Sequence, residues 1–156
     1  MDAARTATAA DVGAIAELAT ELRTELAPMR GGELWSRREA RADRSAGAYG
    51  ALLEDPSAVV AVGTIDGVVV GYGVCVIERL RDGARLGTIP ELFVTLEARE
   101  VGVGEQVIAL LVAECRARGC LGIDTLALPG HRAAKNFFEG SGFTARAIVM
   151  HHALEP

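Results

Sequence analysis

The chain has no apolar run that approaches the roughly 20 residues needed to cross a bilayer. Its longest apolar run, from Gly67 to Ile77, contains three glycines and is typical of a buried strand. The N-terminus lacks a basic region followed by an apolar one, so we expect no secretory signal. Internal repeats and low-complexity tracts are also absent. The 156 residues are long enough for a sizeable core, and we predict a single domain over 1–156.

Cysteine is scarce, and its spacing does not suit a metal. Cys75, Cys115 and Cys120 are odd in number and form no metal-ligand pattern. We therefore expect reduced thiols, a cytoplasmic protein and no bound metal. Positive charge is also in deficit: the net charge of −5 argues against a general nucleic-acid binder.

A glycine-rich turn is the most informative segment. Arg99-Glu-Val-Gly-Val-Gly104 follows the apolar run 89–94 and opens a segment with apolar residues at helical spacing. A turn between a strand and a helix presents several backbone N–H groups at the positive end of the helix dipole. The sequence therefore predicts an anion site here, most often a phosphate site.

The apolar periodicity and the turn signals predict an α+β domain with a mixed, mainly antiparallel sheet flanked by helices. Thr8 is expected to cap the first helix with Asp11 as its capping-box partner, and Asp66-Gly67 to form a type I′ hairpin turn. The predicted order is β-α-α-β-β-β-α-β-α-β, with strands at 5–8, 59–65, 68–77, 85–94, 122–128 and 144–154, and helices before Pro28, at 34–53, up to Gly119 and at 131–139.

Four segments in this order resemble the GNAT superfamily of N-acetyltransferases over nearly the whole chain. They are the hairpin segment Asp66–Tyr72, the strand segment Glu91–Val94, the pattern Arg99-x-x-Gly102-x-Gly104, and the segment Ala134–Phe143. The resemblance implies one GNAT-like domain with acetyl-CoA as cosubstrate. It also implies that an acetyl group moves to a primary amine by direct attack.

In this family the glycine loop binds the pyrophosphate, and a splayed strand hydrogen-bonds the pantetheine arm and the thioester carbonyl. A donor aimed at that carbonyl would stabilise an oxyanion. The positions to which the resemblance gives cofactor contacts are Phe93, Val94, Arg99, Glu100, Val101, Gly102, Val103, Gly104, His131 and Phe138.

Glu91 is the candidate catalytic base, because similar enzymes often carry an acidic residue on this strand near the acceptor amine. The alternative is an exposed carboxylate at a bend after Pro90. Phe138 stands where the family often has the tyrosine that protonates the thiolate, and Phe has no proton to give. Glu100 and Glu105 bring negative charge to the glycine loop, which predicts weakened affinity for the cofactor.

The remaining candidates are less specific. His131 either contacts the pantetheine arm or is a surface histidine at a helix end. Tyr72 is expected in the core, and the neighbouring His151 and His152 point to opposite faces of a strand and cannot easily share a metal. Trp35 and Tyr49 could line the acceptor pocket.

Near Trp35, the arginines at 37, 38, 41 and 44 form either a solvated helix face or a basic wall. A basic wall would favour acceptors with a carboxylate or a phosphate. The apolar final strand, 147–150, would suit a homodimer.

Other classes fit less well. A dinucleotide site would need a third glycine where Val107 stands and a βαβ unit in place of hairpins. A P-loop is excluded because no Gly-Lys-Ser/Thr follows. The alternative of another class is a GNAT-fold module that binds acyl-CoA as a sensor or scaffold with weak catalysis. The missing tyrosine favours it, whereas Glu91 and the glycines oppose it.

Overall fold

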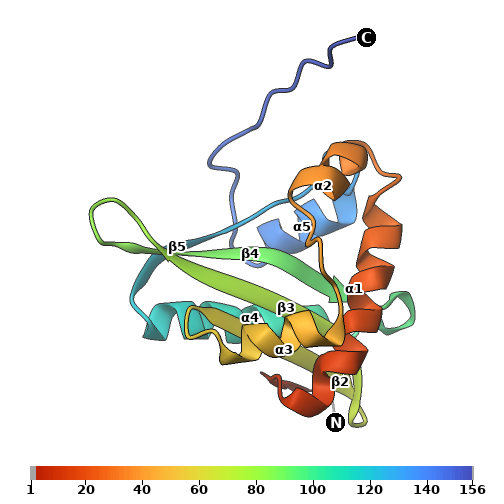
Figure 1. The fold of residues 1–156 in the computed structure, drawn as a ribbon, viewed down its shortest axis with the longest axis vertical. Coiled ribbons are helices and arrows are strands. Elements are labelled where there is room, and N and C mark those ends of the chain that lie inside the picture. Colours follow the sequence, from red (N-terminus) through yellow and green to blue (C-terminus); the bar gives the residue numbers. More distant parts are fainter. Residues whose placement is uncertain (1–2, 156) are drawn as a thin grey trace.

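The computed structural model describes residues 3–155, which form a mixed sheet covered by helices on both faces (Figure 1). Within these residues the sheet has five strands in the order β1-β2-β3-β4-β5, antiparallel except for the parallel pair β4–β5. The strands are β1 (Ala3–Thr6), β2 (Ala58–Ile65), β3 (Val68–Arg79), β4 (Arg85–Val94) and β5 (Cys120–Thr125). The predicted α+β class with a mainly antiparallel sheet is confirmed.

The helices divide between the two faces because alternate strand residues point to opposite sides. The helices are α1 (Val12–Leu26), α2 (Gly32–Arg38), α3 (Ala46–Glu54), α4 (Val103–Ala117) and α5 (Arg132–Gly140). Two short 3₁₀ turns, η1 (Ala9–Asp11) and η2 (Leu96–Ala98), precede α1 and α4. One apolar cluster joins α1, α2 and α3 to Val60, Val62 and Val74. The other joins α4 and α5 to Val59 and Ala61, so the sheet separates two cores.

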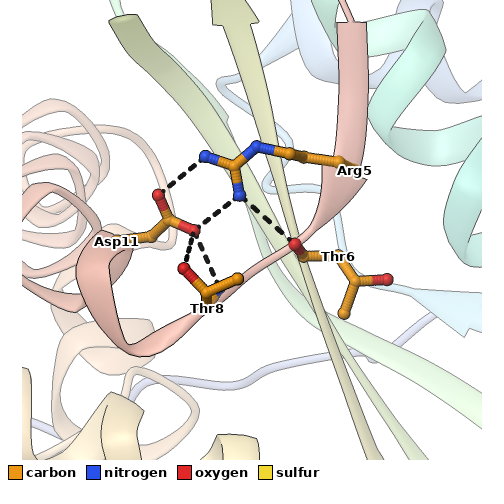
Figure 2. A network of polar contacts seen from close by, with 4 residues as sticks. All are labelled: Arg5, Thr6, Thr8 and Asp11. Atoms are coloured by element: carbon orange, nitrogen blue, oxygen red, sulfur yellow. Dashed lines mark hydrogen bonds and ion pairs between the residues drawn. The ribbon is translucent and has the colours of Figure 1, made fainter. Parts of the chain in front are cut away.

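A charged network fixes the start of α1 (Figure 2). The Asp11 carboxylate, 5% exposed, accepts the Thr8 backbone N–H at 2.7 Å, which completes the predicted capping box. Arg5 from β1 donates to both carboxylate oxygens at 2.7 and 2.9 Å. The hydrogen bonds from Arg5 lower the pKa of Asp11, against a smaller opposing effect of burial. The network therefore joins the edge strand to the first helix.

The predicted hairpin turn is also confirmed. Asp66 and Gly67 have φ values of 49° and 79°, as both central residues of a type I′ turn require. Val68 then pairs with Ile65, and the ladder continues to Val76 opposite Ala58.

The prediction of one helix over 34–53 is wrong. The structure has α2 and α3 instead, separated by residues 39–45. Asp43 accepts the Ser45 backbone N–H at 3.0 Å, and the Ser45 hydroxyl accepts the N–H of Ala48 at 3.2 Å as the N-cap of α3. These short polar side chains compete for backbone donors and start a new helix.

The prediction of a closing strand over 144–154 is wrong as well. Residues 143–155 have no regular secondary structure, and β5 ends at Thr125 rather than at Leu128. Ile148, Val149 and Met150 are 77–87% exposed. Apolar and β-branched residues form a strand only where a neighbouring strand pairs with them, and here none of the described strands does.

Candidate active site

The sheet opens between β4 and β5. β4 pairs with β3 as far as Val94 opposite Gly71, but its parallel pairing with β5 ends at Ile89 opposite Thr125. Residues 90–94 therefore have a strand partner on the β3 side only, within the part of the chain that the structure describes. Backbone groups along this edge can serve a ligand instead of a neighbouring strand.

Glu91 lies in this opened part of β4 and is 6% exposed, so it is not the exposed carboxylate of the alternative interpretation. The hydroxyl of Tyr49 donates to Oε1 of Glu91 at 2.5 Å, and that of Tyr72 donates to the same oxygen at 2.9 Å. Nε of Arg41 donates to Oε2 at 2.8 Å. Three donors thus hydrogen-bond the carboxylate, and such bonds offset the free-energy cost of burying its charge.

The protons of this cluster stay on the donors. Burial, followed by the nearby charge of Glu91, raises the pKa of Tyr49 and of Tyr72 far above the ordinary value. Burial alone would lower the pKa of Arg41, but its contact with Glu91 outweighs this and raises it. A carboxylate has about four lone-pair positions, so one on Oε2 is left for a further donor. Glu91 is therefore the member of the cluster that can accept a further hydrogen bond.

A pocket of ≈ 400 Å³ adjoins Glu91. The segment between α2 and α3, Ala48 of α3 and the opened part of β4 form its wall. The lining residues are Glu39, Arg41, Ala42, Asp43, Ala48, Pro90 and Glu91. The wall thus carries three carboxylates and one guanidinium, so it is not the basic wall that was one of the two interpretations of the arginine cluster.

The other arginines of that cluster are engaged elsewhere. Arg37 pairs with Glu33 at 3.0 Å, Arg38 lies 3.8 Å from Glu39, and Arg44 donates to the backbone carbonyl of Arg41. Trp35 is 7% exposed and packs in the core with α1, away from the pocket lining. Tyr49 is fully buried; its hydroxyl binds Glu91, and the Arg41 guanidinium lies 5.3 Å from the centre of its ring.

The glycine loop lies at the open end of β4. Gly102 has a φ of 90° and is the N-cap of α4, and Glu100 also has a positive φ of 69°. A Cβ on Gly104 would lie 3.2 Å from Cε1 of Phe137 and 3.6 Å from Cγ2 of Val94. The first N–H groups of α4 have no acceptor within the helix. The absence of a side chain at Gly104 lets the start of α4 pack closely against Val94 of β4 and Phe137 of α5.

The Arg99 side chain contacts other residues of the protein. Its Nε donates to the carbonyl oxygen of Val94 at 2.8 Å, and its Nη2 lies 2.9 Å from Glu25 of α1. Its guanidinium also lies 5.2 Å from the centre of the Phe93 ring. The side chain thus ties the loop to β4 and α1 through Nε and Nη2, and the backbone amides of the loop are further anion-binding groups.

His131 lies close to Glu25, the ion-pair partner of Arg99. Its Nε2 lies 3.9 Å from Oε2 of Glu25, and it directly precedes α5. Burial lowers the pKa of His131, with Glu25 opposing and Arg99 reinforcing the shift. A neutral imidazole can donate or accept a hydrogen bond, so His131 suits an amide-rich ligand better than an anion.

Phe138 is 8% exposed and belongs to the core cluster under α4. Its ring lies 5.3 Å from that of Phe137 and 5.5 Å from that of Phe143, both in edge-to-face geometry.

Val101 is half exposed, and His151 and His152 lie on the exposed C-terminal segment. Among residues 3–155, no three His, Cys, Asp or Glu side chains are arranged to hold a metal ion, and no helix is long and apolar enough to cross a membrane.

Sequence reasoning missed the contacts of Arg41 and Tyr72 with Glu91. Val74 pairs with Glu91 and Tyr72 with Phe93, so Tyr72 is the diagonal neighbour of Glu91 on one face. Counting back from the turn at Arg81–Gly83 would have missed this, because an irregularity between Val74 and Val76 shifts the register by one residue. No local sequence pattern indicates that Arg41 contacts Glu91, because the two residues lie 50 positions apart.

The fold and the site define an α+β domain in which a glycine-capped helix N-terminus adjoins an opened strand. Residues 16–143 match the family described as "Acetyltransferase (GNAT) family", so the chain belongs to the GNAT family of acetyltransferases. Members of this family use acetyl-CoA. No curated protein sequence matches the chain.

Solved structures with this fold cover nearly the whole chain. An acetyltransferase from Trypanosoma brucei is 21% identical, with a TM-score of 0.71 and 99% and 100% of the two chains covered. Glucosamine-6-phosphate N-acetyltransferase from Arabidopsis thaliana is 20% identical, with a TM-score of 0.71 and 99% of each chain covered. AAC(6')-Iy in complex with a bisubstrate analogue is 18% identical, with a TM-score of 0.76 and coverages of 100% and 99%. At these identities the likeness concerns the fold.

Proposed function

We propose that this protein moves the acetyl group of acetyl-CoA to a primary amine. The observation that carries the proposal is the buried carboxylate of Glu91, which lies between the acceptor-sized pocket and the opened edge of β4. Because Glu91 keeps one lone-pair position free of internal donors, it can bind an ammonium group, directly or through water, and take its proton. The neutral amine then attacks the thioester carbonyl carbon, and the carbon–sulfur bond breaks.

The glycine loop fits the anionic part of the cosubstrate. The free backbone N–H groups of Val103, Gly104 and their neighbours would hold the pyrophosphate, and Gly104 leaves room for it. The unpaired edge at Phe93 and Val94 would hydrogen-bond the pantetheine arm, and His131 would contact the same arm. Arg99 would act by fixing the loop through Nε and Nη2, which bind Val94 and Glu25, and the N–H groups of its Nη1 would be available to the pyrophosphate.

The charges of the pocket favour a cationic acceptor. Three carboxylates and one guanidinium line the wall, and Arg41 is already paired with Glu91. Glu39, which lies 3.8 Å from the exposed Arg38, and Asp43, which accepts the N–H of Ser45, add negative charge to the wall, so an amine with a second positive group would be favoured over one with a carboxylate or phosphate. The three free thiols support a reducing compartment, the cytoplasm, as the site of this activity.

The alternative function is a module that binds acyl-CoA without efficient turnover. The observation in its favour is Phe138, which has no hydroxyl to protonate the departing thiolate. In the enzyme, solvent would have to supply that proton.

Two measurements on the purified protein test the proposal. The first is the melting temperature with acetyl-CoA; at a concentration of about 100 times the dissociation constant the expected stabilisation is about 2.7 kcal/mol. The second is release of free thiol over a panel of mono- and diamines, which should be fastest with the diamines. Binding without thiol release would support the acyl-CoA module, and no shift at millimolar acetyl-CoA would refute both functions.

A further inference from the structure

Three thiols meet in the core between the sheet and α4, on the face of the sheet opposite the cluster of Tyr49 and Tyr72. Cys75 lies in β3, Cys115 in the last turn of α4 and Cys120 at the start of β5. The Sγ atoms of Cys75 and Cys115 are 3.4 Å apart, and the Cys115 thiol also hydrogen-bonds that of Cys120. The three sulfur atoms thus form a continuous chain with Cys115 in the middle.

Gly87 of β4 makes room for two of these sulfur atoms. A Cβ at this position would lie 2.7 Å from Sγ of Cys115 and 3.2 Å from Sγ of Cys75. Gly87 does not have a positive φ, so its backbone conformation does not require glycine. The close approach of the two thiols to the strand is therefore what the missing side chain allows.

The three thiols differ in access to solvent and in reactivity. Cys75 and Cys115 are 0% and 1% exposed, and burial raises the pKa of both, so they are neutral thiols at neutral pH. Cys120 is the partly exposed member of the cluster. A small oxidant from the solvent therefore meets Cys120 first, and Cys115 lies between Cys120 and Cys75.

We propose that this cluster is a site of reversible oxidation, at which hydrogen peroxide oxidises Cys120 and the product is a disulfide between Cys75 and Cys115. In the first step the Cys120 thiolate attacks one oxygen of hydrogen peroxide. The oxygen–oxygen bond breaks, the departing hydroxide takes a proton to become water, and Cys120 becomes a sulfenic acid.

Two exchanges at sulfur then move the oxidation inwards. Cys115 attacks the sulfur of the sulfenic acid, its proton leaves with the hydroxyl group as water, and a Cys115–Cys120 disulfide forms. Cys75 next attacks the sulfur of Cys115, and its proton passes to the departing thiolate of Cys120. In sum, two thiols lose two electrons and two protons, and hydrogen peroxide becomes two molecules of water.

The final disulfide would join β3 to the last turn of α4. The loop that it closes, 75–115, contains β4, the glycine loop and most of α4. A disulfide that closes a long loop restricts the unfolded chain strongly, whereas the Cys115–Cys120 link of the intermediate closes a short loop and restricts it less. The transfer to Cys75 should therefore be visible as an increase in thermal stability.

The natural protein gives the first test, when it is reduced and then treated with hydrogen peroxide in the folded state. We expect the intact mass to fall by two hydrogen atoms, the thiols titrated after unfolding to fall from three to one, and peptide mapping to find Cys75 joined to Cys115. The melting temperature should rise by roughly 5–15 °C, and dithiothreitol should reverse all of these changes.

Three products would overturn the proposal. They are oxygen added to Cys120 while the other two thiols stay reduced, a Cys120–Cys120 link between two molecules, and a disulfide that stops at Cys115–Cys120. The first two would mean that Cys75 and Cys115 are buried cysteines that only fill space in the core.

Variants test the order of the steps. Cys120→Ser removes the thiol that meets the oxidant, so the Cys75–Cys115 disulfide should form at least about tenfold more slowly. Leu121→Ser is the matched control: this neighbouring side chain is 65% exposed, all three thiols remain, and oxidation should be as fast as in the natural protein. Equal rates in the two variants would refute entry through Cys120.

Cys75→Ala tests the final exchange. Its oxidation should stop at the Cys115–Cys120 disulfide, and the melting temperature should rise much less than in the natural protein. An equal rise would show that the stabilisation does not come from the link between β3 and α4. None of these measurements depends on acetyl transfer.

Discussion

The Tyr49 hydroxyl donates a hydrogen bond of 2.5 Å to Oε1 of Glu91 and thereby joins α3 to the opened part of β4. Tyr72 donates to the same oxygen from β3, and Arg41 donates to Oε2 from the segment between α2 and α3. Four separate parts of the chain thus meet at one carboxylate. Loss of the Glu91 carboxylate should therefore lower both the acetylation rate and the free energy of unfolding. Substitutions of its individual partners can separate the two effects.

Glu91→Gln should lower the acetylation rate by about 10²–10⁴-fold, because the amide cannot take the proton of the acceptor ammonium. The acetyl-CoA-induced shift in melting temperature should stay nearly unchanged, since Glu91 faces the acceptor pocket rather than the glycine loop. Thiol release and thermal unfolding on the same preparation check both parts. Turnover equal to that of the natural protein would assign the base to water or to another group.

Tyr72→Phe should reduce stability by roughly 1.5–3 kcal/mol, because it removes one hydrogen bond to a buried charge while keeping the ring. The same substitution in a Glu91→Gln background should cost less, since the charged partner is gone. Urea unfolding of the four proteins gives this double-mutant cycle. Equal costs in both backgrounds would show that the hydroxyl does not act through Glu91.

Gly104→Val should abolish the acetyl-CoA-induced rise in melting temperature, because a side chain there meets Phe137 and covers the helix N-terminus. Gly102→Ala should cost about 1–2 kcal/mol of stability, since its φ of 90° strains any L side chain. Gly13→Ala is the control: α1 leaves the Cβ open space there, and the change should be neutral or stabilising. A ligand shift that survives Gly104→Val would place the pyrophosphate elsewhere.

The Arg5–Asp11 network predicts a loss of stability in acid. The pKa of Asp11 is lowered in the folded protein from its ordinary value of 3.8, so the folded state favours the ionised carboxylate. This contribution is fully present above pH 3.8 and disappears as the pH falls through the lowered folded pKa. Asp11→Asn should therefore be less stable at pH 7 by roughly 1–3 kcal/mol, and the difference should shrink towards pH 2. Urea midpoints from pH 2 to 7 measure it; parallel pH curves would contradict the role of Asp11.

Phe138→Tyr should keep the fold, because the two residues differ by one hydroxyl, and should raise turnover where departure of the thiolate limits the rate. The hydroxyl would supply the proton that the present side chain lacks. Turnover with a slow and a fast acceptor, together with the melting temperature, checks this. An unchanged rate with every acceptor, or a melting temperature lowered by several degrees, would mean that a hydroxyl on this side chain, which packs with Phe137 and Phe143 in the core, does not reach the thioester.

Features that depend on neighbours in sequence could be predicted. The buried face of α1 (Ile15, Leu18, Ala19, Leu22 and Leu26) follows from helical spacing, and the Asp66-Gly67 turn follows from its local chemistry. The glycine loop could also be predicted from its local sequence, because a positive φ at position 102 favours glycine. The family resemblance rests on such segments and is confirmed.

The site depends on contacts between residues far apart in the sequence, and such contacts are harder to predict from the sequence. The partners of Glu91 lie 19, 42 and 50 positions away, and the break between α2 and α3 that brings Arg41 to it was missed. Arg99 fits the family pattern in sequence, yet its Nε and Nη2 bind Val94 and Glu25 within the protein. The closing strand failed for the same reason, because apolar periodicity does not show whether a pairing edge is available.

The break between α2 and α3 has a consequence for how new specificities can arise. Most of the pocket wall comes from residues 39–48, whereas the proposed cosubstrate contacts come from 93–104 and the start of α5. Insertions or exchanges within 39–45 would alter which amines fit while the thioester-binding half of the molecule stays intact. Randomising this short connection is thus a route to altered acceptor choice, provided that Arg41 is kept to neutralise Glu91.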